Sequence, residues 1–282
     1  MKVFPFKIPK PANIGLIYQE DIEILFYDKL HQHDEIQISF IERGSGTLFI
    51  GDKICNYTQG SVFVIGSNIP HAFKSDKNVA QKSKMLSLFF TKSSFGETFF
   101  ELDEFAEIDI FFEKSSRGFV LKSNIDAIIF IFLQMKKVSK IKRFMHFLEI
   151  LQLLAISETT PLSSFVYQKI YSDMEGKRMR TIFEYTLENY HQKITLQEVA
   201  NKANMTKNAF CKYFKNRTNK TYFNFLNEIR IENASKLIMI KKEISINEIA
   251  YITGFNNISN FNRKFKEIKK MTPLNFKKLQ II

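Results

Sequence analysis

Two groups of side chains in this sequence could do chemistry, and they lie far apart in the chain. The stretch GFNNISNFNRKF, residues 254–265, holds four asparagines, two cations and no acid. Amides and guanidinium groups bond the edges of bases and cations bond phosphates, whereas a duplex repels acids. Three histidines, His31, His33 and His71, offer imidazoles that bind transition metals or polar ligands. The sequence therefore suggests a nucleic-acid surface near its end and a ligand or metal site near its start.

The charge of the chain divides near residue 177. Residues 177–282 hold 21 Lys and Arg against 8 Glu and no Asp, a net charge of +13, whereas the 20 Lys and Arg and 21 Asp and Glu of residues 1–176 leave −1. A basic segment attached to a neutral one indicates polyanion binding by the first and a separate task for the second. From the charge alone, the alternative that the cationic surface only keeps the protein soluble remains open.

The composition indicates a globular protein without a membrane partner. Hydrophobic residues make up 45% of the chain, and the longest apolar run, AIIFIFL at 127–133, is far shorter than the roughly 20 residues that cross a bilayer. The N-terminus has no continuous apolar segment of a secretory signal, and Cys55 and Cys211 are widely separated without a CxxC pair. We therefore expect a cytoplasmic protein.

The basic third contains an internal repeat. The segment ITLQEVANKANMTKNAFCKYF (194–214) aligns with ISINEIAYITGFNNISNFNRKF (244–265), with one extra residue in the turn of the second copy. Each copy begins with an S/T-x-x-E capping box, at Thr195 or Ser245, followed by apolar residues at helical spacing. Each copy is therefore predicted to open with a short helix.

A turn and a second helix follow in each copy. Asn204 and Gly254 are able to take positive φ, and the second helices should begin near Thr206 and Asn257. Their Phe pairs at i, i+4 should face inward and leave a polar, cationic outer face, which describes a helix-turn-helix. The expected DNA-binding residues are Lys207, Asn208, Cys211, Lys212 and Lys215 in the first copy and Asn257, Ile258, Ser259, Asn260 and Arg263 in the second. A solvated helix face is the alternative for each of them, and incidental exposure is the alternative for Cys211.

One long helix is predicted between the copies, over residues 221–240. Twenty helical residues span about 30 Å, close to the roughly 34 Å between successive major grooves on one face of DNA. A single rigid helix could therefore place both second helices in adjacent grooves. A last short helix should open at Thr272-Pro273 and run through Leu279.

The stretches RIENASKLI, ISINEIAYITGF, SNFNRKF and TPLNF, within residues 230–276, resemble the AraC/XylS family of bacterial transcription regulators. The resemblance covers about 100 C-terminal residues. It implies double-stranded promoter DNA and RNA polymerase as partners. Asn204, Asn219 and Lys270 depart from the family pattern, where glycine is usual, and Lys270 should cost about 1 kcal/mol there.

Residues 20–90 alternate β-branched and aromatic runs with Gly or Asn turns, which predicts a small antiparallel barrel or sandwich. Within it, HQHDEIQISFIERGSG and GSVFVIGSNIPHAF resemble the two signature stretches of the cupin barrel. By that resemblance, His31, His33 and His71 fall where metal-dependent cupins hold a metal, and Gln37 replaces the carboxylate ligand. Losing that charge weakens a metal site. We therefore expect these four residues to line a metal-free effector pocket and expect no cofactor; a bound metal and plain structural hydrogen bonding are the alternatives.

The predicted fold class is α+β. Residues 1–96 should form an N-terminal antiparallel β-barrel, cupin-like, and residues 97–156 should be helical, with a wide apolar stripe that packs on the barrel or forms a homodimer interface. Residues 157–177 are expected to be a linker, and residues 178–282 an all-α domain of two helix-turn-helix motifs.

The predicted function is a sequence-specific transcription regulator controlled by a small-molecule effector, with sugars as the class that the family resemblance implies. We expect no enzymatic activity. One alternative is a metal-dependent cupin enzyme that its basic C-terminal domain localises on nucleic acid. Another is a nonspecific architectural DNA binder. The sequence leaves activation, repression and the oligomeric state open.

Overall fold

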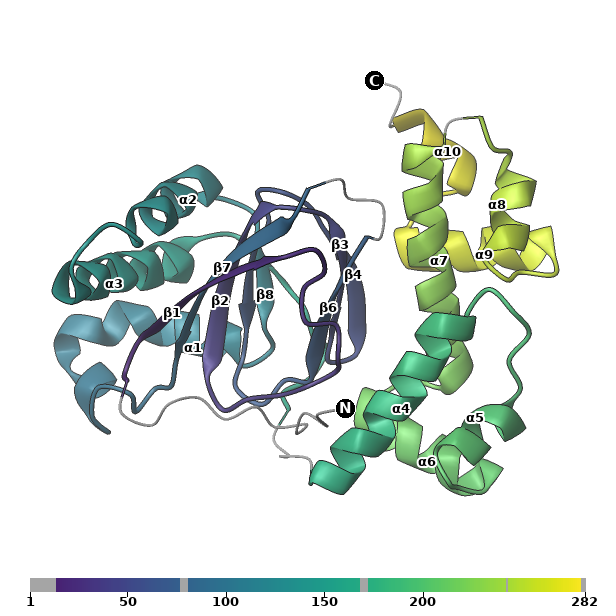
Figure 1. Cartoon of the computed structure of the whole chain (residues 1–282), viewed down its shortest axis with the longest axis horizontal. Helices are drawn as coiled ribbons and strands as arrows, with labels where there is room; N and C mark the ends of the chain where they lie inside the picture. Colours follow the sequence, from purple (N-terminus) through teal and green to yellow (C-terminus); the bar gives the residue numbers. More distant parts are fainter. Residues whose placement is uncertain (1–13, 77–80, 168–171, 242, 280–282) are drawn as a thin grey trace. The chain divides into compact units, whose positions relative to one another are not determined.

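The structure is a computed structural model that describes residues 14–76, 81–167, 172–241 and 243–279. The chain forms two compact units, Met1–Gly176 and Lys177–Ile282 (Figure 1). The first contains all of the described strands and the second contains helices alone. The predicted α+β class is confirmed.

The first unit is built on two antiparallel sheets. One has six strands in the order β1-β7-β2-β5-β8-β9, and the other has three in the order β4-β3-β6. The strands are β1 Ile17–Glu23, β2 Ile36–Arg43, β3 Gly46–Ile50, β4 Lys53–Tyr57, β5 Val62–Ile65, β6 His71–Ser75, β7 Ser83–Phe90, β8 Phe119–Leu121 and β9 Thr159–Pro161. The expected barrel is not closed, because β1, β9, β4 and β6 end their sheets as edges; the two antiparallel sheets agree with the sandwich that the sequence left as the alternative. His31 and His71 form an isolated antiparallel bridge outside these ladders.

The six-stranded sheet is covered on both faces, which explains why its central strands are apolar almost throughout. In β2, Ile36, Ile38 and Phe40 join the core on the helical side. Ile41, on the opposite face of the same strand, joins a second core with residues of the three-stranded sheet. Alternate residues of a strand point to opposite faces, so one strand supplies both cores. The unit thus has three layers: helices, large sheet and small sheet (Figure 1).

The helical layer consists of two short 3-10 helices and three α-helices. They are Phe99–Glu101, Asp103–Ile108, α1 Asp109–Ser115, α2 Ile125–Gln134 and α3 Lys140–Ile156. Most of the predicted apolar stripe, including Phe132, Phe147 and Leu151, is buried against the sheet. Phe130 and Ile141 remain 66% and 69% exposed, so the homodimer interface stays a proposal.

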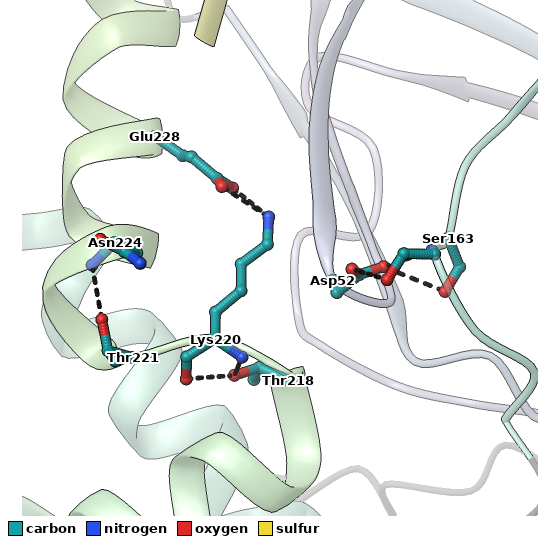
Figure 2. A network of polar contacts seen from close by, with 8 residues as sticks. Asp52, Ser163, Thr218, Lys220, Thr221, Asn224 and Glu228 are labelled. Atoms are coloured by element: carbon teal, nitrogen blue, oxygen red, sulfur yellow. Dashed lines mark hydrogen bonds and ion pairs between the residues drawn. The ribbon is translucent and has the colours of Figure 1, made fainter. Parts of the chain in front are cut away.

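Two short strands were missed by the sequence analysis, which predicted only helix over 97–156 and a linker over 157–177. β8 lies between α1 and α2, and β9 pairs with it at the edge of the large sheet. Asp52 then fixes the chain after β9, because its carboxylate accepts hydrogen bonds from the Ser163 hydroxyl at 3.0 Å and the Ser164 amide at 2.9 Å (Figure 2). Residues 159–164 are therefore part of the first unit and not a linker.

The second unit has seven helices in its described residues. They are α4 Asp173–Asn189, which begins four residues before the unit boundary, α5 Leu196–Lys202, α6 Lys207–Thr218, α7 Tyr222–Ile240, α8 Ile246–Ile252, α9 Ile258–Lys269 and α10 Pro273–Leu279. The pair α5–α6 lies toward one end of α7 and the pair α8–α9 toward the other, and both lie on the same side of α7 in the view of Figure 1. The predicted repeat, connecting helix and last helix are confirmed.

The predicted turn chemistry is also present. Asn204 and Gly254 have φ of 53° and 90°, and the residue after each donates its amide to the first helix at 2.9 Å, Met205 to Ala200 and Phe255 to Ala250. The first copy has a complete capping box, with Thr195 and Glu198 bonded in both directions. In the second, Ser245 accepts from the Glu248 amide, but the return bond is not formed in the described residues. The expectation of two full boxes is therefore wrong for the second copy.

In the part of the chain that the structure describes, no helix combines the length and the apolar character needed to cross a membrane.

Candidate nucleic-acid interface and ligand pocket

Aromatic side chains hold α6 and α9 in place. Phe210 and Phe214 of α6 contact the Tyr222 ring of α7, each at 5.5 Å between centroids. In the second copy, Phe261 contacts Phe255 at 5.2 Å and Phe265 contacts Phe276 of α10 at 5.5 Å. All four inward Phe side chains are buried, as the i, i+4 spacing predicted. The opposite faces of α6 and α9 therefore point to solvent.

The structure exposes every predicted DNA-binding residue. Five lie in each copy, on the N-terminal halves of the two helices and at the N-cap of α9, except Lys215, which lies in the C-terminal half of α6. We call these the α6 set (Lys207, Asn208, Cys211, Lys212, Lys215) and the α9 set (Asn257, Ile258, Ser259, Asn260, Arg263). No described residue of either set is acidic, so both surfaces suit a polyanion.

Within the α9 set the side chains bond to one another. Asn257 caps the helix, because its Oδ1 accepts the amides of Ser259 at 2.8 Å and Asn260 at 3.1 Å. The Arg263 guanidinium donates to Asn260 Oδ1 at 2.9 Å and lies 3.6 Å from the Glu267 carboxylate. The guanidinium is therefore held along the exposed face of α9 even when no DNA is bound. Asn257 serves the backbone here, and its expected contact with DNA remains a proposal.

The acids of α7 are paired with lysines, which removes their repulsion toward a polyanion. Lys220 contacts both carboxylate oxygens of Glu228 at 2.6 Å (Figure 2). One turn further, Lys269 at the end of α9 contacts Glu232 at 2.6 and 2.7 Å. Glu232 is buried, so removing Lys269 would leave a buried carboxylate without its cation, and breaking this link between α9 and α7 costs more than breaking a surface ion pair.

Arg230 joins the two copies, and the sequence analysis missed this role. From α7 its guanidinium donates to the Tyr190 carbonyl and to the Gln192 carbonyl, each at 2.7 Å. A Cβ on Gly254 would lie 2.6 Å from that same Tyr190 oxygen and 2.9 Å from Arg230 Nε. Burial lowers the pKa of Arg230 from its usual value. The turn of the second copy is thus packed directly on the chain that leads into the first.

The three predicted histidines come together in the first unit, all buried. Their ring centroids are 4.3 Å apart for His31 and His71, 5.0 Å for His33 and His71, and 6.0 Å for His31 and His33. Each Nδ1 lies 2.8 Å from a backbone carbonyl, that of Lys29, Glu35 or Ile69. A carbonyl only accepts, so each Nδ1 carries hydrogen.

Gln37, the fourth predicted residue, is buried beside this cluster. Its Oε1 lies 3.1 Å from His33 Nε2, its Nε2 lies 2.8 Å from Ser39 Oγ, and Ser39 Oγ lies 2.8 Å from Ser87 Oγ. A buried polar chain thus runs from His33 into the space between the sheets.

A cavity of about 390 Å³ opens above the cluster and is lined by all four predicted residues. Its wall also contains Gln19, Asp21 and Glu23, which the sequence analysis missed. Their spacing of two along β1 places them on one face of that strand, and this alternation was the available signal. Among the described lining residues there is no Lys or Arg, so the wall carries negative charge.

The comparisons with known proteins match both halves of the chain. A family model described as an AraC-like ligand binding domain matches residues 13–88, and one described as a helix-turn-helix domain matches residues 199–279. The uncharacterized HTH-type transcriptional regulator YdeC of Bacillus subtilis (strain 168) is 25% identical over 262 residues, which are 90% of this chain and 87% of YdeC. The HTH-type transcriptional activator RhaR of Mannheimia succiniciproducens is 24% identical over 253 residues, 88% of this chain and 86% of RhaR.

Among solved structures, apo ToxT from Vibrio cholerae covers 93% of this chain and 97% of its own, with a TM-score of 0.38 and 15% identity. The C-terminal domain of AraT, a response regulator from Geobacillus stearothermophilus, covers 40% of this chain and 91% of its own, with a TM-score of 0.35 and 23% identity.

The two family models together match more than half of the residues, with the ligand-binding domain ahead of the helix-turn-helix domain. The chain belongs to the AraC family of DNA-binding transcription regulators.

Proposed function

We propose that this regulator reads promoter DNA with the α6 and α9 sets placed in successive major grooves, under the control of a small molecule bound in the histidine-lined cavity. One observation carries the DNA-reading part: two helix-turn-helix copies expose polar faces, whose α6 and α9 sets contain no acid, toward the two ends of a single helix, α7. Nineteen residues give α7 a length of about 28 Å. That length is near the groove repeat of about 34 Å, and a modest DNA bend would supply the difference at about 1 to 6 kcal/mol.

The two sets have different tasks in this proposal. Asn bonds adenine and Arg bonds guanine through paired hydrogen bonds, so Asn260 and Arg263 discriminate between bases. Lysines bind phosphates without reading sequence, so Lys207, Lys212 and Lys215 supply affinity and register. The α9 surface therefore contributes more to specificity than the α6 surface does.

Binding measurements with the full chain test this division. An operator is first selected from random DNA, and affinities are then measured for every single-base variant of it at several salt concentrations. Arg263→Ala should lose about 1 to 3 kcal/mol, mainly at one base position. Lys215→Ala should weaken all sequences alike and reduce the salt slope by about 1. Lys241→Ala, an exposed cation at the C-terminal end of α7, serves as the control and should change neither quantity.

Two outcomes would defeat the proposal. A sequence-independent loss for Arg263→Ala would remove its base-reading role. If random DNA competed as well as the selected operator, the chain would be a nonspecific architectural DNA binder.

The cavity is the proposed effector site because it combines enclosure, a polar floor and acidic walls in a domain matched as ligand-binding. Hydroxyl-rich molecules such as sugars fit carboxylate and amide acceptors. We propose that the pocket binds its ligand without transforming it, so that the effector is recovered unchanged after incubation; turnover would instead support the cupin enzyme.

The same proposal includes the partners and the location of the regulator. It contacts RNA polymerase, forms a homodimer through the exposed residues of α2 and α3, acts in the cytoplasm and activates transcription. The last is supported by the relative named as a transcriptional activator.

A further inference from the structure

Strand β1 separates two cavities of different chemistry. Gln19, Asp21 and Glu23 line the histidine-lined cavity. Tyr18 of β1, and Leu16 just before it, pack instead on the core of the helical side. Alternate residues of a strand point to opposite faces, so the two groups lie on opposite sides of β1. A second cavity of about 440 Å³ opens on the helical side, between the start of β1 and the start of α3, and we call it the α3 cavity.

The walls of the α3 cavity combine apolar side chains with two cations. Leu16, Phe95 and Phe144 supply the apolar part, and the rings of Phe95 and Phe144 lie 4.8 Å apart. Lys140 and Arg143 of α3 supply the cations, and the described lining residues include no Asp or Glu. Apolar walls with a few convergent polar groups are typical of small-molecule sites. The charge of these walls favours an anion.

Two contacts hold the Arg143 side chain in place. Its Nε donates to the Met135 carbonyl at 2.9 Å, and its guanidinium carbon lies 4.8 Å from the centre of the Tyr18 ring. The nearby acid Glu20, which accepts from the Tyr18 hydroxyl at 3.3 Å, is bonded to Lys136 at 3.0 Å. Arg143 itself forms no ion pair within the described residues. Both Nη groups are therefore left to bind an anion, and the planar guanidinium matches a carboxylate.

The first turn of α3 has a charge that opposes the helix dipole. Lys140, Lys142 and Arg143 lie in this turn, and no acid does. The N-terminal end of a helix carries a partial positive charge, so acids are favoured there and cations are disfavoured. Sequences break such local rules chiefly at functional sites. A bound anion would relieve the repulsion among the cations and interact favourably with the dipole.

We propose that the α3 cavity binds a small carboxylic acid with an aromatic or short aliphatic body. The carboxylate pairs with Arg143 and Lys140, and the apolar body packs against Leu16, Phe95 and Phe144. This site is independent of the proposed effector site, because the two cavities lie on opposite faces of β1 and their charged side chains have opposite signs. A ligand in the α3 cavity contacts both β1 and α3 and so links the edge of the large sheet to the helical layer.

Isothermal titration calorimetry of the full chain tests the site with acids of increasing apolar size. The probes are acetate, benzoate and octanoate, and benzamide and octanamide are neutral counterparts of the larger two. We expect the better of benzoate and octanoate to bind with a Kd below about 1 mM. Acetate lacks the apolar body and the amides lack the charge, so each should bind at least about 10-fold more weakly.

Four variants locate the bound acid. Arg143→Gln should weaken its binding at least about 10-fold, and Lys140→Gln, which removes a more exposed cation, about 3-fold. Lys142→Gln is the matched control, because Lys142 is exposed in the same turn of α3 but does not line the cavity, and it should change the Kd less than about 2-fold. Asp21→Asn, on the opposite face of β1, should leave the Kd equally unchanged.

The proposal is overturned if no acid of the panel binds below this limit, or if the amides bind as tightly as the acids. It is also overturned if Lys142→Gln weakens binding as much as Arg143→Gln, because the acid would then respond only to the general positive charge. A loss in Asp21→Asn without a loss in Arg143→Gln would place the acid in the histidine-lined cavity and refute the α3 cavity. Should Arg143→Gln not fold, an unchanged affinity in Lys140→Gln overturns the proposal instead.

Discussion

The contact between Gly254 and the Tyr190 carbonyl makes a sharp prediction, because the two copies differ at this turn. The first copy has Asn204 at φ 53°, whereas the second has Gly254 at φ 90°. Asn enters the left-handed region more readily than most residues with a Cβ, so conformation alone would make Asn at the second turn costly but not prohibitive. In the second copy, however, a Cβ would lie 2.6 Å from a backbone oxygen that cannot move aside as a flexible side chain would. We therefore predict that Gly254→Asn destabilises the second helix-turn-helix.

The expected loss in free energy of unfolding for Gly254→Asn has two contributions. Backbone strain for a residue with a Cβ at this φ costs about 1 to 2 kcal/mol. Moving the Tyr190 carbonyl disrupts its hydrogen bond from Arg230 at 2.7 Å, and hydrogen bonds to charged groups contribute about 1.5 to 3 kcal/mol. The sum is about 2.5 to 5 kcal/mol. Part of the strain is relieved by relaxation, so we expect about 3 kcal/mol.

Hydrogen exchange in the full chain locates this effect. The free energy of local opening should fall for the amides of α8 and α9, and operator affinity should fall with it because the turn sets the position of α9. The matched control is Asn204→Gly in the first copy, which should change stability by less than about 1 kcal/mol. If Gly254→Asn left the exchange of α8 and α9 within about 0.5 kcal/mol of the wild type, the inference that Gly254 is required by close packing would be wrong.

Three further changes test other contacts. Thr195→Ala removes the N-cap of α5 and should cost about 1 kcal/mol, seen as faster exchange in its first turn. Burial raises the pKa of Tyr222, because the folded state favours the neutral phenol. The contribution of Tyr222 to the free energy of unfolding should therefore be complete below about pH 10 and be lost as the pH rises further. Tyr222→Phe should reduce this loss, measured as the fall in the temperature of thermal unfolding between about pH 9 and 11. Alkylation of the exposed Cys211 should slow when operator DNA is bound while that of Cys55 does not, and equal rates with and without DNA would place α6 outside the groove.

Features of the second unit were predictable because their signals are local. Capping residues and i, i+4 aromatic pairs act within one or two turns of helix, and Thr206, Thr221 and Ser245 cap the helices that the sequence assigned to them. Lys270 also adopts the left-handed conformation, with φ 61°, where the family pattern has glycine. Its neighbour Lys269 is held by Glu232, and this pair offers a reason why the strained turn is tolerated.

The features of the first unit that were missed are those that depend on contacts between residues distant in the sequence. β8 has three residues and pairs with β5, more than 50 residues earlier, so no local pattern distinguishes it from a helix end. Asp52 and Ser163 are separated by 111 residues. Nothing in the stretch SETTPLSS, residues 157–164, indicates that it packs against the sheets. The four cavity residues were found from their types and spacing. The orientation of the rings, however, depends on backbone carbonyls of neighbouring loop residues, and the acidic wall on the position of β1 beside β7.

The two copies of the repeat have diverged in a way that bears on specificity. In α9 the Arg263 guanidinium is already bonded to Asn260 Oδ1, so part of its side-chain entropy is lost before DNA binds. The α6 set has three lysines and no arginine, and a lysine is a flexible point charge without the paired donors that distinguish guanine. Preorganised hydrogen-bond donors gain more binding free energy from the correct base than flexible donors do. Lysine ammonium groups, by contrast, gain nearly the same binding free energy from every phosphate. Exchanging the exposed residues of α6 for those of α9 should therefore raise discrimination between operators more than it raises total affinity, which the single-base binding series measures directly.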